Sequence, residues 1–205
     1  MRHKRRTNKR KRSVKPRLLI LCEGETERNY FEAMKEDDDY ESKMAAAKIT
    51  ILTAKSPTPE QIIKEAIKKG NEAKREKNPY EMIWVVFDHD NHPHRKEAYD
   101  NAIKDKLEIK VAFSAICFET WYLLHFEKSA KSYSNASKLI ITLKKHYPNY
   151  QKAKQNDFVN LKPNLQKAIE NAKWLRKRMN DEEMHITDYN PWTDVDLLIK
   201  DLNNL

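Results

Sequence analysis

The chain has 205 residues, with 40 Lys and Arg against 31 Asp and Glu and a formal net charge of +9. A chain of this length can bury its own core, and its two cysteines, Cys22 and Cys117, lie in apolar stretches typical of buried thiols in a reducing compartment. No apolar run approaches the roughly 20 residues of a spanning helix. We therefore expect a cytoplasmic protein without a membrane partner.

The positive charge is concentrated at the start of the chain. Residues 1–15, "MRHKRRTNKRKRSVK", include nine Lys and Arg and no acid, so the remainder is neutral. Such a block buries too little apolar surface to fold alone and is typical of a disordered arm. We expect it to neutralise nucleic-acid phosphates, although a solubilising tail is the alternative. The predicted contacts are Arg5, Arg6, Lys9, Arg10, Lys11 and Arg12.

Apolar runs and helical patterns alternate through the first half of the chain. The apolar runs predict strands, and the segments between them predict helices. The first predicted helix is capped by Thr26, the second has Pro59 in its first turn, and the third follows a charged loop. This alternation predicts an α/β fold with a mostly parallel four-stranded sheet flanked by helices. The predicted strands are 17–22, 48–53, 81–88 and 108–116, and the predicted helices are 25–37, 58–77 and 94–106.

The second half shows only helical patterns. The segment 118–126 is apolar nearly all round, which favours burial between the sheet and the later helices over a base-stacking platform. The last helix opens with Thr193 and Asp196, a capping-box-like start. Further helices are predicted at 134–147, 162–181 and 193–202. The expected organisation is an arm (1–15), an α/β core (16–117) and a helical extension packed on it (118–205).

Acidic side chains occur where three of the predicted strands end. The first strand is followed by Glu23 and, one helical turn later, Glu27; the third ends at Asp88 and Asp90; Glu119 follows the fourth. In open α/β sheets ligands bind outside the carboxyl ends of the strands. Clustered carboxylates raise one another's pKa unless a cation is present, and oxygen ligands select Mg²⁺ or Mn²⁺. Taken singly, each acid is also an ordinary helix or turn residue.

The chain has only two glycines. Gly24 lies between acids where the first strand ends, so we expect either a positive φ or a close approach of phosphate to its backbone. Gly70 lies inside the predicted helix 58–77, where glycine is about 1 kcal/mol worse than alanine. Gly70→Ala is therefore expected to be neutral or mildly stabilising.

Three histidines, His89, His92 and His94, surround the third strand's end. With Cys22 or Cys117 they could form a zinc site, but the neighbouring carboxylates favour a harder ion. Contact of His89 or His92 with a scissile phosphate, or proton relay, is preferred to zinc binding, and an ordinary loop histidine is the remaining interpretation.

Three stretches in this order, "ILCEGETERNYF", "VVFDHDNH" and "AICFETWYLLHFE", resemble the RloB/AbiLii-like family, whose core looks like a Toprim domain. The closing "NPWTDVDLLIKDL" is similar to that family's C-terminal segment, so the resemblance covers roughly residues 16–202. One departure is the turn "SAICFE", where related sequences tend to have an "NPCFE"-like turn.

The resemblance implies roles for the acids. In the Toprim superfamily the Glu of an "EG" turn and both Asp of a "DxD" turn bind Mg²⁺, which corresponds to Glu23, Asp88 and Asp90. Similarity to OLD-type nucleases adds Glu27 and Glu119 as metal ligands.

The implied activity is a metal-dependent nuclease in bacterial antiviral or abortive-infection defence, often beside a separately encoded ATPase partner. Its catalytic residues would be Glu23, Asp88, Asp90 and His89, and its substrate RNA, tRNA included, or DNA. The alternative is a non-catalytic nucleic-acid-binding or sensor subunit of a defence complex.

Overall fold

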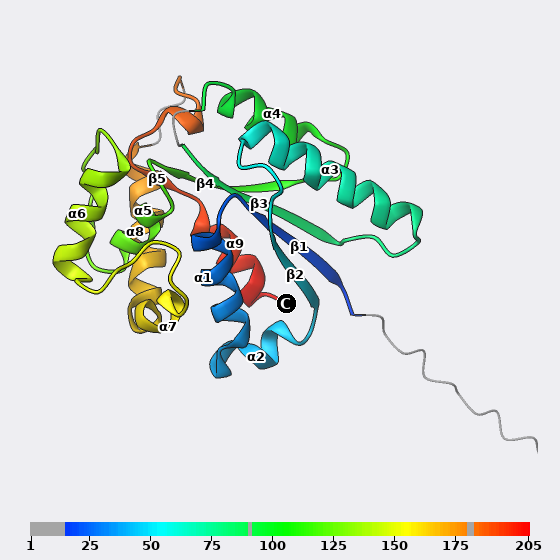
Figure 1. Ribbon diagram of the computed structural model, residues 1–205, viewed down its shortest axis with the longest axis horizontal. Coiled ribbons are helices and arrows are strands. Elements are labelled where there is room, and N and C mark those ends of the chain that lie inside the picture. The colour runs from blue at the N-terminus through cyan, green and yellow to red at the C-terminus, as the bar shows by residue number, and fades with distance from the viewer. Residues whose placement is uncertain (1–14, 90–91, 180–182) are drawn as a thin grey trace, which may run out of the picture.

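A computed structural model describes residues 15–89, 92–179 and 183–205 of the chain. One twisted sheet crosses the molecule, with helices on both of its faces (Figure 1). The strand order is β2-β1-β3-β4-β5, and the first four strands are parallel. The strands are β1 (Arg17–Cys22), β2 (Lys48–Thr53), β3 (Met82–Asp88), β4 (Lys110–Ala115) and β5 (Trp192–Thr193). The predicted α/β class and mostly parallel sheet are confirmed.

Side chains of the central strands alternate between two apolar layers because successive strand residues point to opposite faces. Ile20 and Val86 face one layer, while Leu21 and Val85 face the other. Two helices, α3 (Pro59–Arg75) and α4 (Arg95–Lys104), cover the second layer. Burial on both faces explains why these strands read as continuous apolar runs.

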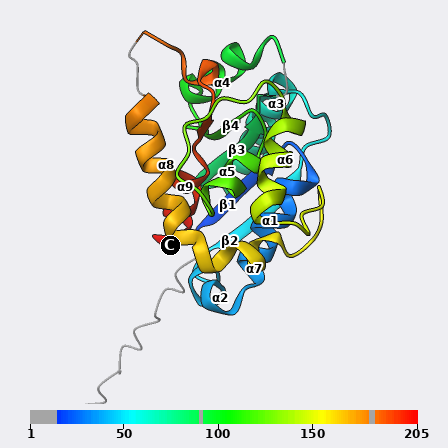
Figure 2. The same ribbon diagram turned by 90° about the vertical axis from the view of Figure 1, so that its left-hand side faces the viewer.

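Most of the remaining helices pack against the apolar layer that contains Ile20 and Val86 (Figure 2). Among them α5 packs between α6 and α8. They are α1 (Glu25–Glu36), α2 (Asp38–Met44), α5 (Glu119–Leu124), α6 (Ala136–His146), α7 (Asp157–Leu161), α8 (Leu165–Met179) and α9 (Val195–Asn203), with 3₁₀ turns η1 (Lys162–Asn164) and η2 (Ile186–Asp188). None of the described helices is long and apolar enough to cross a membrane.

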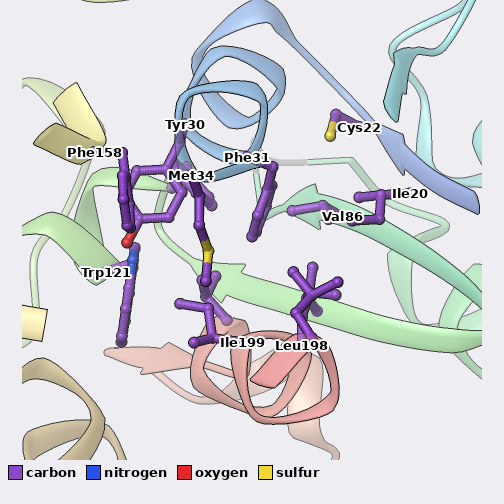
Figure 3. Packing of buried hydrophobic residues seen from close by; sticks show 14 of the residues in the cluster. Ile20, Cys22, Tyr30, Phe31, Met34, Val86, Trp121, Phe158, Leu198 and Ile199 are labelled. Atoms are coloured by element: carbon purple, nitrogen blue, oxygen red, sulfur yellow. The ribbon is translucent and has the colours of Figure 1, made fainter. Parts of the chain in front are cut away.

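The aromatic helix α5 is buried, as its pattern predicts. Trp121 packs beside Phe158 and Tyr30 in a core that also receives Leu198 and Ile199 from α9 (Figure 3). The predicted boundary between the α/β core and the helical extension lies after residue 117. The apolar cluster contains residues from before and after that boundary, from Leu18 to Leu202. The proposed division into a core and a helical extension stays a prediction.

The sheet has a fifth strand that the sequence did not predict. β5 pairs antiparallel with β4, and the Thr193 and Ser114 hydroxyl oxygens lie 2.9 Å apart. Thr193 therefore belongs to a strand and Asp194, not Thr193, is the N-cap of α9. Two residues are too few to show an alternating pattern, so only pairing with β4 reveals this strand.

The start of α1 also differs from the prediction. Gly24, not Thr26, is the N-cap residue of this helix. Thr26 lies within the first turn, where its Oγ1 accepts a hydrogen bond from the Ala153 backbone at 3.2 Å. A long-range partner therefore takes the hydroxyl that local capping would have used.

The packing of Gly70 changes the expectation for its substitution. A Cβ at this position would lie 2.6 Å from Leu107 Cδ1 and 2.9 Å from Ile83 Cδ1. An overpacking cost of about 1–3 kcal/mol opposes the helix-propensity gain of about 1 kcal/mol, and the two contacted atoms are methyl ends of side chains. The packing therefore favours a destabilising Gly70→Ala, whereas helix propensity alone favours a neutral or mildly stabilising one, and that earlier expectation stays a prediction.

We predict that Gly70→Ala lowers the free energy of unfolding by about 1 kcal/mol, measured by urea denaturation. The control is Asn71→Ala at the exposed neighbouring position, which gains helix propensity without a clash. Equal stability of Gly70→Ala and the wild type would show that Leu107 and Ile83 move aside freely.

Candidate metal centre

The carboxyl ends of β1, β3 and β4 border a cleft of about 410 Å³. Four of the predicted acids line it: Glu23, Glu27, Asp88 and Glu119. Asp90, the fifth, lies outside the described residues, as do the six arm residues Arg5 to Arg12 named above. The structure thus brings together every predicted metal ligand that it describes, while their role as ligands stays a prediction. A larger groove of about 640 Å³ between α3 and α4 is lined by none of them.

Glu23 is held at the end of the sheet by hydrogen bonds to β3. Its backbone N–H donates to Val86 O at 2.9 Å, which extends the β1–β3 ladder by one residue. Its carboxylate Oε2 accepts the Asp88 N–H at 2.9 Å, and Oε1 lies 3.8 Å from His92 Nε2. Glu23 is 9% exposed, and its hydrogen bond to the Asp88 N–H holds the carboxylate beside Asp88.

Gly24 does not have the predicted positive φ, since its φ of −134° and ψ of −178° are extended. The residue has a different use. The Glu27 carboxylate folds back so that its Oε2 accepts the Gly24 N–H at 3.2 Å, and a Cβ on Gly24 would lie 3.1 Å from that oxygen. A glycine therefore allows the closest approach of Glu27 to the backbone. Gly24 also lines the cleft, and the predicted approach of a phosphate to it remains untested.

Glu27 is buried in the cleft wall close to Glu119. Burial, with a smaller contribution from the Glu119 charge, raises the pKa of Glu27 to about 7. The hydrogen bond from Gly24 N–H acts in the opposite direction. Near neutral pH a nearby cation would therefore favour the charged form of this carboxylate.

Glu119 is the first residue of α5 and is 2% exposed. Its Oε1 accepts a hydrogen bond from the hydroxyl of Tyr150, which is 1% exposed and lies in the loop between α6 and α7. No spacing in "HYPNYQK" signals this contact, because it joins residues from distant segments. Tyr150 orients a carboxylate of the cleft and is a site residue that sequence reasoning missed.

Lys152, two residues further along this loop, is also missed by the sequence. Of the described residues that line the cleft, it is the only Lys or Arg. Burial lowers its pKa, but the negative charges of Glu119, Asp88 and Glu27 outweigh that effect and leave the pKa raised. The cleft therefore combines several carboxylates with one ammonium group.

His89 lines the cleft beside Asp88, and its backbone N–H donates to Ser114 O at 3.1 Å. His94 instead is an exposed N-cap of α4. Both Cys22 and Cys117 are buried free thiols, and burial is the main cause that raises the pKa of each. High thiol pKa values oppose the deprotonation that zinc ligation requires.

The donor chemistry of the cleft suits a hard cation. Its acidic oxygens are those that Mg²⁺ and Mn²⁺ prefer, and such ions keep several water ligands rather than filling a protein cage. Within residues 15–89, 92–179 and 183–205, however, no three His, Cys, Asp or Glu side chains are grouped closely enough to hold a metal ion. The fit therefore rests on ligand type and on placement in one cleft.

The Tyr150 contact generates a prediction. Tyr150→Phe removes the only hydroxyl donor recorded for Glu119 among the described residues, so a buried carboxylate loses a partner. We expect a loss of about 1–3 kcal/mol in unfolding free energy. If the carboxylates of the cleft bind a divalent ion, as the sequence predicts, the Mn²⁺ affinity should fall about 10–100-fold, because Tyr150 orients one of the predicted ligands.

Tyr147→Phe is the matched control, because Tyr147 donates to the carboxylate of Asp157 at 2.8 Å and neither residue lines the cleft. Tyr147→Phe should lose stability and keep its Mn²⁺ affinity. Equal losses of Mn²⁺ affinity in both variants would show that Tyr150 acts only through stability.

The comparisons with known proteins agree with the residues on which the resemblance was based. A family model described as RloB-like protein matches residues 18–202. No match was found among the curated proteins or among the solved structures. The matched range includes all the acids of the cleft and the C-terminal segment that forms β5 and α9. The chain belongs to the RloB-like family.

Proposed function

We propose that the protein is an Mg²⁺- or Mn²⁺-dependent nuclease with a Toprim-type core that hydrolyses phosphodiester bonds. The observation that carries this proposal is the meeting of Glu23, Glu27, Asp88 and Glu119 in one cleft at the carboxyl ends of parallel strands. Asp90, next to His89 in sequence, would complete the ligand set. Ordered acids at such an edge are typical of metal-dependent phosphoryl chemistry.

A bound divalent ion would supply an activated water and neutralise charge on the phosphate. The chain's own residues hold the geometry. Asp88 N–H orients the Glu23 carboxylate, and Tyr150 orients that of Glu119. His89 lines the cleft, where we assign it contact with the scissile phosphate or proton transfer.

The biological setting is proposed from family similarity. It is bacterial antiviral or abortive-infection defence, with a separately encoded ATPase as the partner and RNA, tRNA included, or DNA as the substrate. The second candidate is a non-catalytic nucleic-acid-binding or sensor subunit. The observation that favours it is that the described residues contain no group of three ligands already arranged for a metal.

Substitution of two acids separates the candidates. We expect Asp88→Asn and Glu23→Gln each to reduce cleavage more than about 100-fold, because each loses a charged ligand while keeping its shape. Glu23→Gln also keeps an oxygen for the Asp88 N–H. Without metal, thermal stability should stay level or rise, since like-charge repulsion decreases.

The assay uses mixed tRNA, single-stranded RNA, single-stranded DNA and plasmid DNA with Mg²⁺, Mn²⁺ or chelator. The control is Glu36→Ala, an exposed acid at the opposite end of α1 from the cleft residues. Cleavage at the wild-type rate by either acid variant would disprove the metal site. Binding without cleavage by the wild type would favour the sensor subunit.

A second prediction concerns the basic arm. Deleting residues 1–15 should weaken nucleic-acid binding and reduce the slope of log K against log salt, because the segment carries the whole net charge. The measurement is fluorescence anisotropy over a salt series in chelator. An unchanged slope after deletion would show that the arm does not contact phosphates.

A further inference from the structure

Two side chains of helix α1 form hydrogen bonds with the loop that carries Lys152. Ala153 N–H donates to Thr26 Oγ1 at 3.2 Å, and Ala153 O accepts from Asn29 Nδ2 at 2.9 Å. Both backbone groups of one loop residue are thus bonded to side chains of one helix. We call Thr26, Asn29 and Ala153 the loop clasp.

The clasp holds an uncommon backbone conformation. Ala153 has φ of 59°, in the left-handed region that residues with a Cβ seldom adopt. The loop turns tightly here, since Lys154 N–H donates to Gln151 O at 3.2 Å. A conformation of this kind persists where surrounding contacts impose it, and the two hydrogen bonds from α1 are such contacts.

Two residues of the loop clasp, Thr26 and Ala153, adjoin charged residues of the cleft in the chain. Thr26 is 4% exposed and adjoins Glu27 in the chain, while Ala153 adjoins Lys152. All four of these residues line the same cleft. A change in the clasp would therefore move the ammonium group relative to the carboxylates.

Lys152 needs such an anchor because a lysine side chain is long and flexible, and ordering it costs free energy. An anchored backbone reduces the number of positions that the ammonium group can reach. A cation opposite a group of carboxylates is suited to a phosphate that approaches the same cleft.

We propose that Thr26 and Asn29 are positioning residues that, through Ala153, place Lys152 to bind a phosphate group of the nucleic-acid substrate. The inference rests on the proposed nuclease function and adds a phosphate-binding loop to it. It assigns a role to contacts between α1 and the loop that metal binding alone does not require.

A double-mutant cycle on the full chain tests the inference, with whichever of the four substrates the wild type cleaves. Lys152→Met should lower kcat/KM by about 100-fold. Thr26→Val, which keeps the shape and removes the acceptor oxygen, should lower it by about 10-fold. The double variant should be no slower than Lys152→Met alone, because Thr26 acts through Lys152.

Three further measurements make the result specific. Thr26→Ser, which keeps the acceptor, should recover most of the activity lost in Thr26→Val. Lys154→Met, at an exposed position in the same loop, should cleave normally. Mn²⁺ affinity, measured without nucleic acid, should be equal in the wild type and Thr26→Val, which separates the clasp from displacement of Glu27.

Two outcomes would overturn the inference while leaving the nuclease function standing. One is a Lys152→Met variant that cleaves at the wild-type rate. The other is a Thr26→Val effect of the same size in the wild-type and Lys152→Met backgrounds. A wild type that cleaves none of the four substrates with Mg²⁺ or Mn²⁺ would instead overturn the nuclease proposal and the inference with it.

Discussion

The hydrogen bonding between β1 and β3 is the interaction on which the candidate site depends. Register along these strands pairs Cys22 with Val86, and one further bond joins Glu23 N–H to Val86 O. The ladder therefore ends with Glu23 beside Asp88, whose N–H returns a bond to the Glu23 carboxylate. Because β4 pairs with β3 in parallel, the segment that leads to Glu119 leaves the sheet at the same edge.

Charge crowding at this edge needs support from the helices. Glu27 and Glu119 are both nearly inaccessible, and burial of carboxylates is costly unless polar partners face them. The partner of Glu27 is local, the N–H of Gly24, whereas the partner of Glu119 is the hydroxyl of Tyr150 from a later loop. The loop between α6 and α7 thus supports the acids, which makes the helical half of the protein part of the site.

Long-range contacts altered two of the local expectations, and a local contact altered a third. A capping pattern predicted a local role for Thr26 and for Thr193, yet Ala153 donates to the first and Ser114 contacts the second. Glycine in a turn suggested a left-handed backbone at Gly24, whereas the space is used by the Glu27 carboxylate. In each case the residue type was informative, but the local pattern did not predict the partner: Ala153 and Ser114 are distant in sequence, whereas Glu27 lies three residues from Gly24.

The sequence by itself determined the four parallel strands, the main helices and the acids at the strand ends. It could do so because hydrophobic periodicity and the position of an acid after an apolar run are local properties. Only the tertiary structure decided the two-residue strand β5, the Tyr150 contact with Glu119 and the place of Lys152 in the cleft. These features depend on contacts between segments that are distant in sequence, and a local sequence pattern does not predict such contacts.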